Sequence, residues 1–192
     1  MILAALMALS LQSPELSATC NIAFTINRTF ADDIAIACNA PEDNAGAEAE
    51  ALRQVSWERE YSEHLIERNG DRIETTLTLY GDRTGSGIDW WGPSQILVRL
   101  APQYPVNANF AAARASCIVA YNVRNGFTRV VGSNCNARER SEDFGRATRN
   151  TIRRYIFSHG RDVDCRLAYI NYAMDRGDEP DWPEAPPCES ED

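Results

Sequence analysis

The chain has 192 residues, of which 44% are hydrophobic and 24% charged, so it has the composition of a folded protein with one ordinary domain or two small ones. Its net charge of −9 argues against nucleic acid as a partner, because affinity for phosphates depends on basic groups. No apolar stretch reaches the ~20 residues that a membrane-spanning helix needs.

The N-terminal segment, residues 1–18, has the pattern of a signal peptide. Its apolar run from Ile2 to Leu11 has the length of a signal-peptide core and is too short to span a membrane. Ser10 and Ala18 are small residues after which the chain could be cut. The segment therefore predicts a periplasmic or secreted protein whose mature chain has no membrane span. Because no basic residue precedes the apolar run, a buried N-terminal helix stays open as the alternative.

Two segments of the chain, residues 20–40 and 117–137, are copies of each other. They align without a gap, share six of 21 positions and both end in Cys-Asn-Ala. In the second copy Cys117, Val119, Tyr121 and Val123 share one parity, which is typical of a strand. The turn Asn125-Gly126 that follows is typical of a β-hairpin. Each copy is therefore predicted to be a hairpin.

The six cysteines are an even number, and together with an export signal they predict disulfides. If each hairpin loop is centred on Thr29 or Gly126, Cys20 faces Cys38 and Cys117 faces Cys135. A two-residue turn would shift this pairing by one position. Cys165 could bond Cys188, and buried free thiols are the alternative. No metal site is expected, because there is no Cys-x-x-Cys and both histidines are far from any cysteine pair.

A helix candidate and a third strand follow each hairpin. Residues 42–61 and 141–157 have helical patterns, and residues 72–80 and 162–172 have strand patterns. The prediction is an α+β fold with two modules of the order strand-strand-helix-strand, each a three-stranded antiparallel sheet covered by one helix. The expected domains are residues 19–82 and 99–174. Residues 83–98 form the expected linker, and residues 175–192 an acidic, Pro-rich tail.

Residues 97–172 resemble the C-terminal domain of the energy transducer TonB. Tyr104-Pro105 match the Tyr-Pro step that precedes an Ala-rich helix in that family, and the strand from Cys117 matches its Val-x-Val-x-Phe-x-Val pattern. Tyr155 and Phe157 fall on the pattern of its closing helix. Residues 20–80 resemble a diverged second copy. The fold is thus expected to be TonB C-terminal-like, as in Gram-negative periplasmic proteins.

The resemblance implies a non-catalytic protein without cofactors that binds a protein or an extended peptide, in the family a segment of an outer-membrane receptor. The binding strand would be the edge strand with Val163, Cys165, Leu167, Tyr169 and Asn171, to which a peptide can add as a further strand. The alternative is an ordinary strand with one core face and one solvated face. The sequence shows no long N-terminal span and no Pro-rich spacer, so a part in TonB-dependent transmembrane transport is expected without direct force transduction.

Charge is unevenly distributed along the chain. Residues 1–98 have a balance of −9, residues 99–174 of +7 and residues 175–192 of −7. The basic second module is therefore expected to meet either the acidic tail or an acidic partner, since such fields steer encounter and orientation. A solvated tail that aids solubility is the alternative.

Signals of catalysis are sparse. His64 and Glu67 lie one helical turn apart, but no second histidine completes a metal-binding pair. Trp90-Trp91 are predicted to lie in a loop and either to stack a ligand or to pack a linker onto its neighbours. A structural protein with two disulfide-bonded modules paired to each other is the first alternative function, and an enzyme of unknown class the second.

Overall fold

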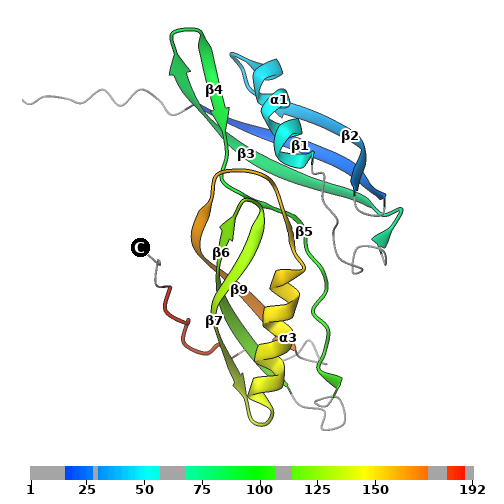
Figure 1. The fold of residues 1–192 in the computed structure, drawn as a ribbon, viewed down its shortest axis with the longest axis vertical. Coiled ribbons are helices and arrows are strands. Elements are labelled where there is room, and N and C mark those ends of the chain that lie inside the picture. Colours follow the sequence, from blue (N-terminus) through cyan, green and yellow to red (C-terminus); the bar gives the residue numbers. More distant parts are fainter. Residues whose placement is uncertain (1–15, 28–29, 57–67, 107–113, 173–180, 189–192) are drawn as a thin grey trace, which may run out of the picture.

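The computed structural model describes residues 16–27, 30–56, 68–106, 114–172 and 181–188. These residues form a mixed α+β structure with two helices and mostly antiparallel sheets, as predicted. Two modules follow one another along the longest axis of the molecule (Figure 1).

The first module is a four-stranded sheet with one helix packed on it (Figure 1). Its elements are β1 (Leu16–Asn27), β2 (Phe30–Asn39), α1 (Asn44–Val55), β3 (Arg72–Thr84) and β4 (Gly87–Trp91), and the strand order is β2-β1-β3-β4. Side chains of β1 alternate between buried and more exposed positions, which is the pattern of a sheet with one covered face. Asp43 begins α1, because its carboxylate accepts a hydrogen bond from the N–H of Gly46 at 2.9 Å.

The second module repeats this arrangement with three strands. Its elements are β6 (Ala115–Arg124), β7 (Phe127–Ala137), α3 (Ser141–Arg153) and β9 (Val163–Tyr172), and the strand order is β7-β6-β9. In both modules the first strand of the hairpin is central, and the third strand pairs with it antiparallel on the other side. The helix lies between the second and third strands in the chain and packs on the sheet.

Each hairpin combines a two-residue connection with a shift in register. In the second hairpin Arg124 pairs with Phe127, and Asn125 and Gly126 between them have φ angles of 52° and 77°, which suit this tight turn. An extra residue in β7 then shifts the register by one position.

The first hairpin follows the same plan. Asn27 pairs with Phe30, and the register shifts in β2 near Asp33, whose φ angle is 49°. The β-bulge thus compensates the one-residue offset that a two-residue turn introduces, and the cysteines of each hairpin face each other.

Three disulfides are present, as the cysteine pattern predicts. Cys20–Cys38 and Cys117–Cys135 each join directly opposite residues of a hairpin, with Cα atoms 3.9 Å and 4.1 Å apart. Cys165–Cys188 ties β9 to the C-terminal segment, residues 181–188, with Cα atoms 5.3 Å apart. Closing an 18-residue loop stabilises a fold by about 3 kcal/mol in the chain-entropy model.

A short two-stranded sheet joins the modules. It consists of β5 (Ile96–Val98) and β8 (Ile156–Phe157), which pair antiparallel. Val98 and Ile156 pack into the core of the first module, whereas Ile96 and Phe157 pack against the core of the second. The two cores are therefore separate but share this sheet as their boundary.

Buried polar side chains hold the same junction together. Gln54, Ser94 and Ser158 are all fully buried. The hydroxyl of Ser158 donates to Oε1 of Gln54 at 3.2 Å and accepts the N–H of Gln95 at 3.0 Å. Gly160 lies so close to the opposite backbone that an added Cβ would be 2.5 Å from the carbonyl oxygen of Gly92. A side chain at this position would push the two segments apart.

The structure differs from the predicted elements in two places. Residues 83–98, expected to be a linker with Trp90-Trp91 in a loop, contain β4 and β5. Trp90 and Trp91 lie in β4, which gives the first sheet four strands instead of the expected three. The helix expected over residues 141–157 ends at Arg153, so Tyr155 and Phe157 do not lie on it. Ending the helix there lets Ile156 and Phe157 enter β8 and bury their side chains in two different cores.

Candidate functional site

The predicted partner-binding strand, β9, lies at the edge of the second sheet. It pairs with β6 on one side, and the sheet order β7-β6-β9 ends with it. No strand of the described part of the chain pairs with its outer side. Its outward-pointing N–H and C=O groups are thus placed where an added strand could bind them.

The equivalent strand of the first module, β3, has the C-terminal half of its outer edge occupied, from Thr78 to Thr84. The strand β4 pairs with its C-terminal end, from Tyr80↔Trp91 to Thr84↔Gly87. One step along the strand, the side-chain amide of Gln95 binds both backbone groups of Thr78. It accepts the N–H at 3.1 Å and donates to the carbonyl at 2.8 Å. The two copies of the module therefore differ at this edge.

A bulge at the beginning of β9 divides the predicted binding residues between two faces. Val163 packs against the core, whereas Leu167 and Tyr169 are 37% and 56% exposed on the other face. Cys165 lies in the bulge and has a φ angle of 49°. Its backbone N–H donates to Oδ1 of Asn122 at 2.9 Å. Leu167, Tyr169 and the exposed Asn171 share one face of the edge strand.

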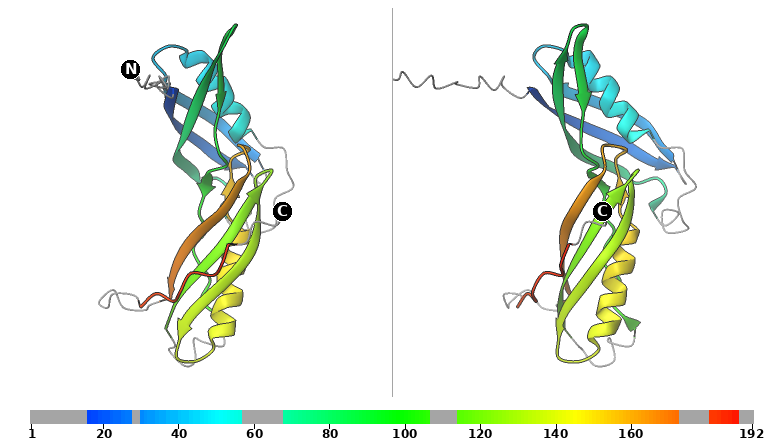
Figure 2. Two further views of the ribbon diagram at one scale, coloured as in Figure 1. Left: turned by 90° about the vertical axis from the view of Figure 1, so that its left-hand side faces the viewer. Right: turned by 60° about the vertical axis from the view of Figure 1, so that its left-hand side comes forward.

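The C-terminal segment crosses that face of the sheet, opposite α3 (Figure 2). The indole of Trp182 packs edge-on against Tyr169, with ring centroids 5.4 Å apart. The amide of Asn136 donates to Asp181 at 2.7 Å, and that of Asn134 to the carbonyl of Glu184 at 2.9 Å.

These contacts bury β6 on both faces, because nine of its ten residues are buried. The segment covers a face of the sheet and takes no place in the strand order. Residues 181–188 of the acidic tail thus lie on the basic module, as one of the expectations had it. Among the described residues, these contacts are a disulfide, an aromatic pair and amide hydrogen bonds, and none is an ion pair.

The family-motif residues lie mostly in the core of the second module. Tyr104 meets Phe144 edge-on, with ring centroids 5.5 Å apart. Phe157 is fully buried and packs against Tyr121 at 5.9 Å. Tyr155 packs against the same core, and Pro105 is half-buried. The Ala-rich segment that follows Pro105 includes residues 107–113, which lie outside the described residues.

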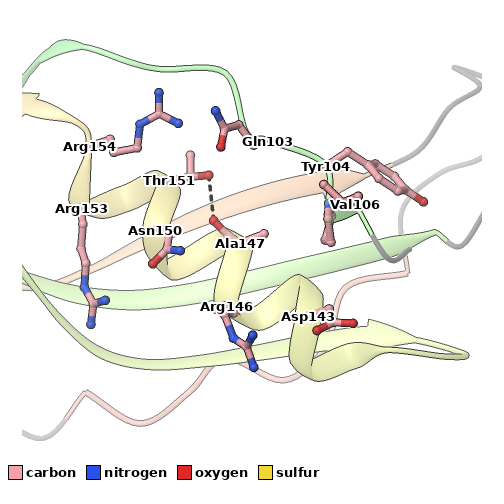
Figure 3. A pocket seen from close by; sticks show the side chains of 11 residues that line it. Gln103, Tyr104, Val106, Asp143, Arg146, Ala147, Asn150, Thr151, Arg153 and Arg154 are labelled. Carbon is pink, nitrogen blue, oxygen red and sulfur yellow. Dashed lines mark hydrogen bonds between the residues drawn. The ribbon is translucent and has the colours of Figure 1, made fainter. Parts of the chain in front are cut away.

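A groove runs between α3 and the segment of residues 103–106 (Figure 3). It has a volume of about 670 Å³. Arg146, Arg153 and Arg154 line it, together with one acidic residue, Asp143, which faces Arg140 at 3.6 Å. The groove therefore has a net positive lining.

Two buried phenols beside the core have altered acidity. Burial raises the pKa of Tyr121, and the charges of Arg166 and Arg99 lower it in part. Burial also raises the pKa of Tyr155, against the opposing charge of Arg99. Both are core groups away from the outer edge of β9.

The remaining candidates form no metal-binding cluster in the described residues. No group of three His, Cys, Asp or Glu side chains there could hold a metal, and all six cysteines are in disulfides. His64 lies outside these residues. Trp90 is buried and donates to Asp43 at 3.1 Å, while Arg161 covers the ring of Trp91 at 3.8 Å, so the pair packs rather than stacks a ligand.

The residues that sequence reasoning missed are side-chain amides. Gln95, Asn122, Asn134 and Asn136 all bind backbone or acidic groups of distant segments. No local pattern marks such an amide, because its partner comes close only in the folded chain. Across the described residues, no helix is both long and apolar enough to cross a membrane.

Comparison with protein-family models gives no match, and comparison with curated proteins gives none either. Neither result bears on the resemblance to the TonB C-terminal domain, which stays an expectation based on the motifs. The role of β9 is therefore argued from the geometry of the edge.

Proposed function

We propose that the protein is a non-catalytic, exported binding protein. Its second module receives an extended peptide of a protein partner, which adds as a strand to the outer edge of β9. In this proposal the module is TonB C-terminal-like, and its partner is a segment of another envelope protein, such as an outer-membrane receptor.

The observation that carries the proposal is the contrast between the two edges. The strand β4 and the amide of Gln95 occupy the outer side of β3 from Thr78 to Thr84, whereas no strand among the described residues pairs with the outer side of β9. Exposed edges invite pairing with other chains, and proteins normally cover or blunt them. An edge that is half covered in one copy and has no described partner strand in the other suits a binding site.

The rest of the second module is built to keep this edge in place. The disulfide Cys117–Cys135 joins β6 to β7, and Cys165–Cys188 fixes the beginning of β9. Disulfides of this kind form in oxidising compartments. The periplasm is the compartment we propose, since the partner class would be met there.

The experiment is an NMR titration of the isotope-labelled mature protein with short linear peptides selected for binding to it. Backbone amides of β9 should shift on peptide binding, and their hydrogen exchange should slow, because they gain ladder hydrogen bonds. Amides of residues 78–84 in β3 form the internal control, since β4 and Gln95 occupy that part of the edge.

Peptides N-methylated at alternate residues separate strand addition from side-chain binding. Methylation of the N–H groups that face β9 should abolish binding, and methylation of the other set should preserve it. Equal effects of both sets, or shifts confined to other surfaces, would rule out the edge as the binding site.

The buried junction favours a second function, that of a structural protein with two locked modules. Gln54 and Ser158 join the modules through a fully buried hydrogen bond. The four-stranded and the three-stranded sheet remain separate, so the modules are joined end to end through the β5–β8 pair and not by pairing of these two sheets. Strong protection of the β9 amides without any peptide would favour this function.

A further inference from the structure

The solvent side of α3 carries a row of arginines that the core and the edge of β9 do not use. Arg146 and Arg153, with Asn150 between them, are spaced i, i+4 and i+7 and therefore share one side of the helix. All three are exposed and line the groove against residues 103–106 (Figure 3). We propose that this groove binds an acidic peptide segment of a partner protein.

The strongest argument for an anionic ligand comes from the side chain of Arg154. Its side chain extends toward Gln103 at the wall of the groove (Figure 3). Its Nε atom is buried and has no acceptor among the described residues. A buried donor without an acceptor is costly, and a carboxylate in the groove would relieve this cost.

Among the described residues that line the groove, the arginines outnumber the acidic residues by three to one. Asp143 is its single acidic residue, and its carboxylate faces Arg140 at 3.6 Å, outside the groove. The helix dipole accounts for a cation in the last turn such as Arg153, but not for Arg146 in the middle of the helix. Three arginines therefore line the groove, and no ion pair with a carboxylate is present for any of them among the described residues.

The spacing of the arginines favours a peptide over a single small anion as the ligand. Arg146 and Arg153 begin about 10 Å apart along the helix, given a rise of ~1.5 Å per residue. Carboxylates on successive outward residues of an extended chain are about 7 Å apart, so two of them can reach both arginines.

An apolar wall adds a second preference. Tyr104, Pro105 and the 75% exposed Val106 form the side of the groove opposite the arginines, so acidic residues interleaved with small apolar ones fit best.

The test uses a synthetic peptide of alternating Glu and Val and the matched peptide of Gln and Val, titrated into the labelled protein. The Glu peptide should shift the Nε–H signal of Arg154 and the amides of Ala147 and Asn150. Binding should weaken about tenfold in the double variant Arg146→Gln, Arg153→Gln, because two charge-assisted contacts are lost. Arg72→Gln, on the first module, is the matched control and should change affinity by less than about twofold.

Thermal unfolding of each variant checks that it is folded, and Arg146→Lys, which keeps the charge, should retain part of the binding. The proposal is overturned if the Gln peptide binds equally well or if Arg72→Gln weakens binding as much as the double variant. It is also overturned if inorganic phosphate or vesicles with anionic lipid shift the Arg154 signal and the Glu peptide does not.

Discussion

Ile156 and Phe157 are neighbours in β8, yet the side chain of Ile156 packs into the core of the first module and that of Phe157 into the core of the second. They are 1% and 0% exposed. Because one short strand serves both cores, unfolding of either module removes the support of the other. The two modules are therefore expected to unfold in one transition.

Substitution at this junction should lower the stability of both modules. Ile156→Ala should cost about 2–5 kcal/mol and Phe157→Ala about 3–5 kcal/mol, through lost burial and the cavities left behind. Urea unfolding followed by amide signals of β1 and β6 measures the modules separately. Val106→Ala, at a 75% exposed position, is the control and should change stability by less than about 0.5 kcal/mol. Two transitions, each moved by only one variant, would contradict the shared junction.

The two cysteine hairpins could be predicted from the sequence only in part. The repeat and its strand parity predict both hairpins, and the structure contains them. The pairing of Cys117 with Cys135 depends on whether the two-residue turn is compensated. The sequence marks the turn with Asn125-Gly126, but the compensating bulge in β7 has no residue signal of its own. In the first copy, the sequence likewise does not predict the positive φ angle of Asp33.

The C-terminal end of α3 shows why other elements could not be predicted. Residues 141–157 keep a helical pattern, but the helix ends at Arg153. Instead of continuing the helix, Phe157 pairs with Ile96 in the β5–β8 sheet and packs in the core of the second module. Such tertiary competition is invisible to a local pattern. The edge of β9 was predictable as a strand, but its contrast with β3 depends on Gln95, which only the fold brings to Thr78.

Release of the C-terminal segment should destabilise the second sheet. The double variant Cys165→Ala, Cys188→Ala removes the bond that closes residues 165–188, which is worth about 3 kcal/mol in the chain-entropy model. Hydrogen exchange of the β6 amides should then speed up, because Ile118 and Ala120 lose their cover on that face. The double variant Cys20→Ala, Cys38→Ala is the matched control. It should lower overall stability by a similar amount and leave the C-terminal segment in place. Unchanged exchange in β6 after loss of Cys188 would contradict the covering role.

The mature N-terminus should precede Leu16. Residues Leu16 to Ala18 pair with Leu79 to Gly81 in the β1–β3 ladder, and Ala18 is 2% exposed. A cut after Ala18 would remove these pairs, whereas a cut after Ser10 would keep them. Intact mass and N-terminal sequencing of protein from the periplasmic fraction measure the site.

A chain that starts at Thr19 tests the reason for this expectation. It should be less stable than one that starts before Leu16, by about 1 kcal/mol for each ladder hydrogen bond lost. A mature chain found to start at Thr19 with undiminished stability would show that the first residues of β1 are dispensable.

Stability should fall in alkaline solution because of the buried tyrosines. Burial raises the pKa of Tyr121, of Tyr155 and of Tyr172, whose hydroxyl is within 3.1 Å of that of Thr148. Above the usual phenol pKa of about 10, the unfolded chain releases protons that the folded chain keeps. The stabilisation is thus complete below that pH and is lost as the pH rises through the folded pKa values. Urea unfolding between about pH 8 and pH 11 measures the slope. Tyr121→Phe keeps the buried ring and removes one phenol, so its slope should be shallower than that of the parent protein. An equal slope would show that Tyr121 does not contribute to the alkaline loss.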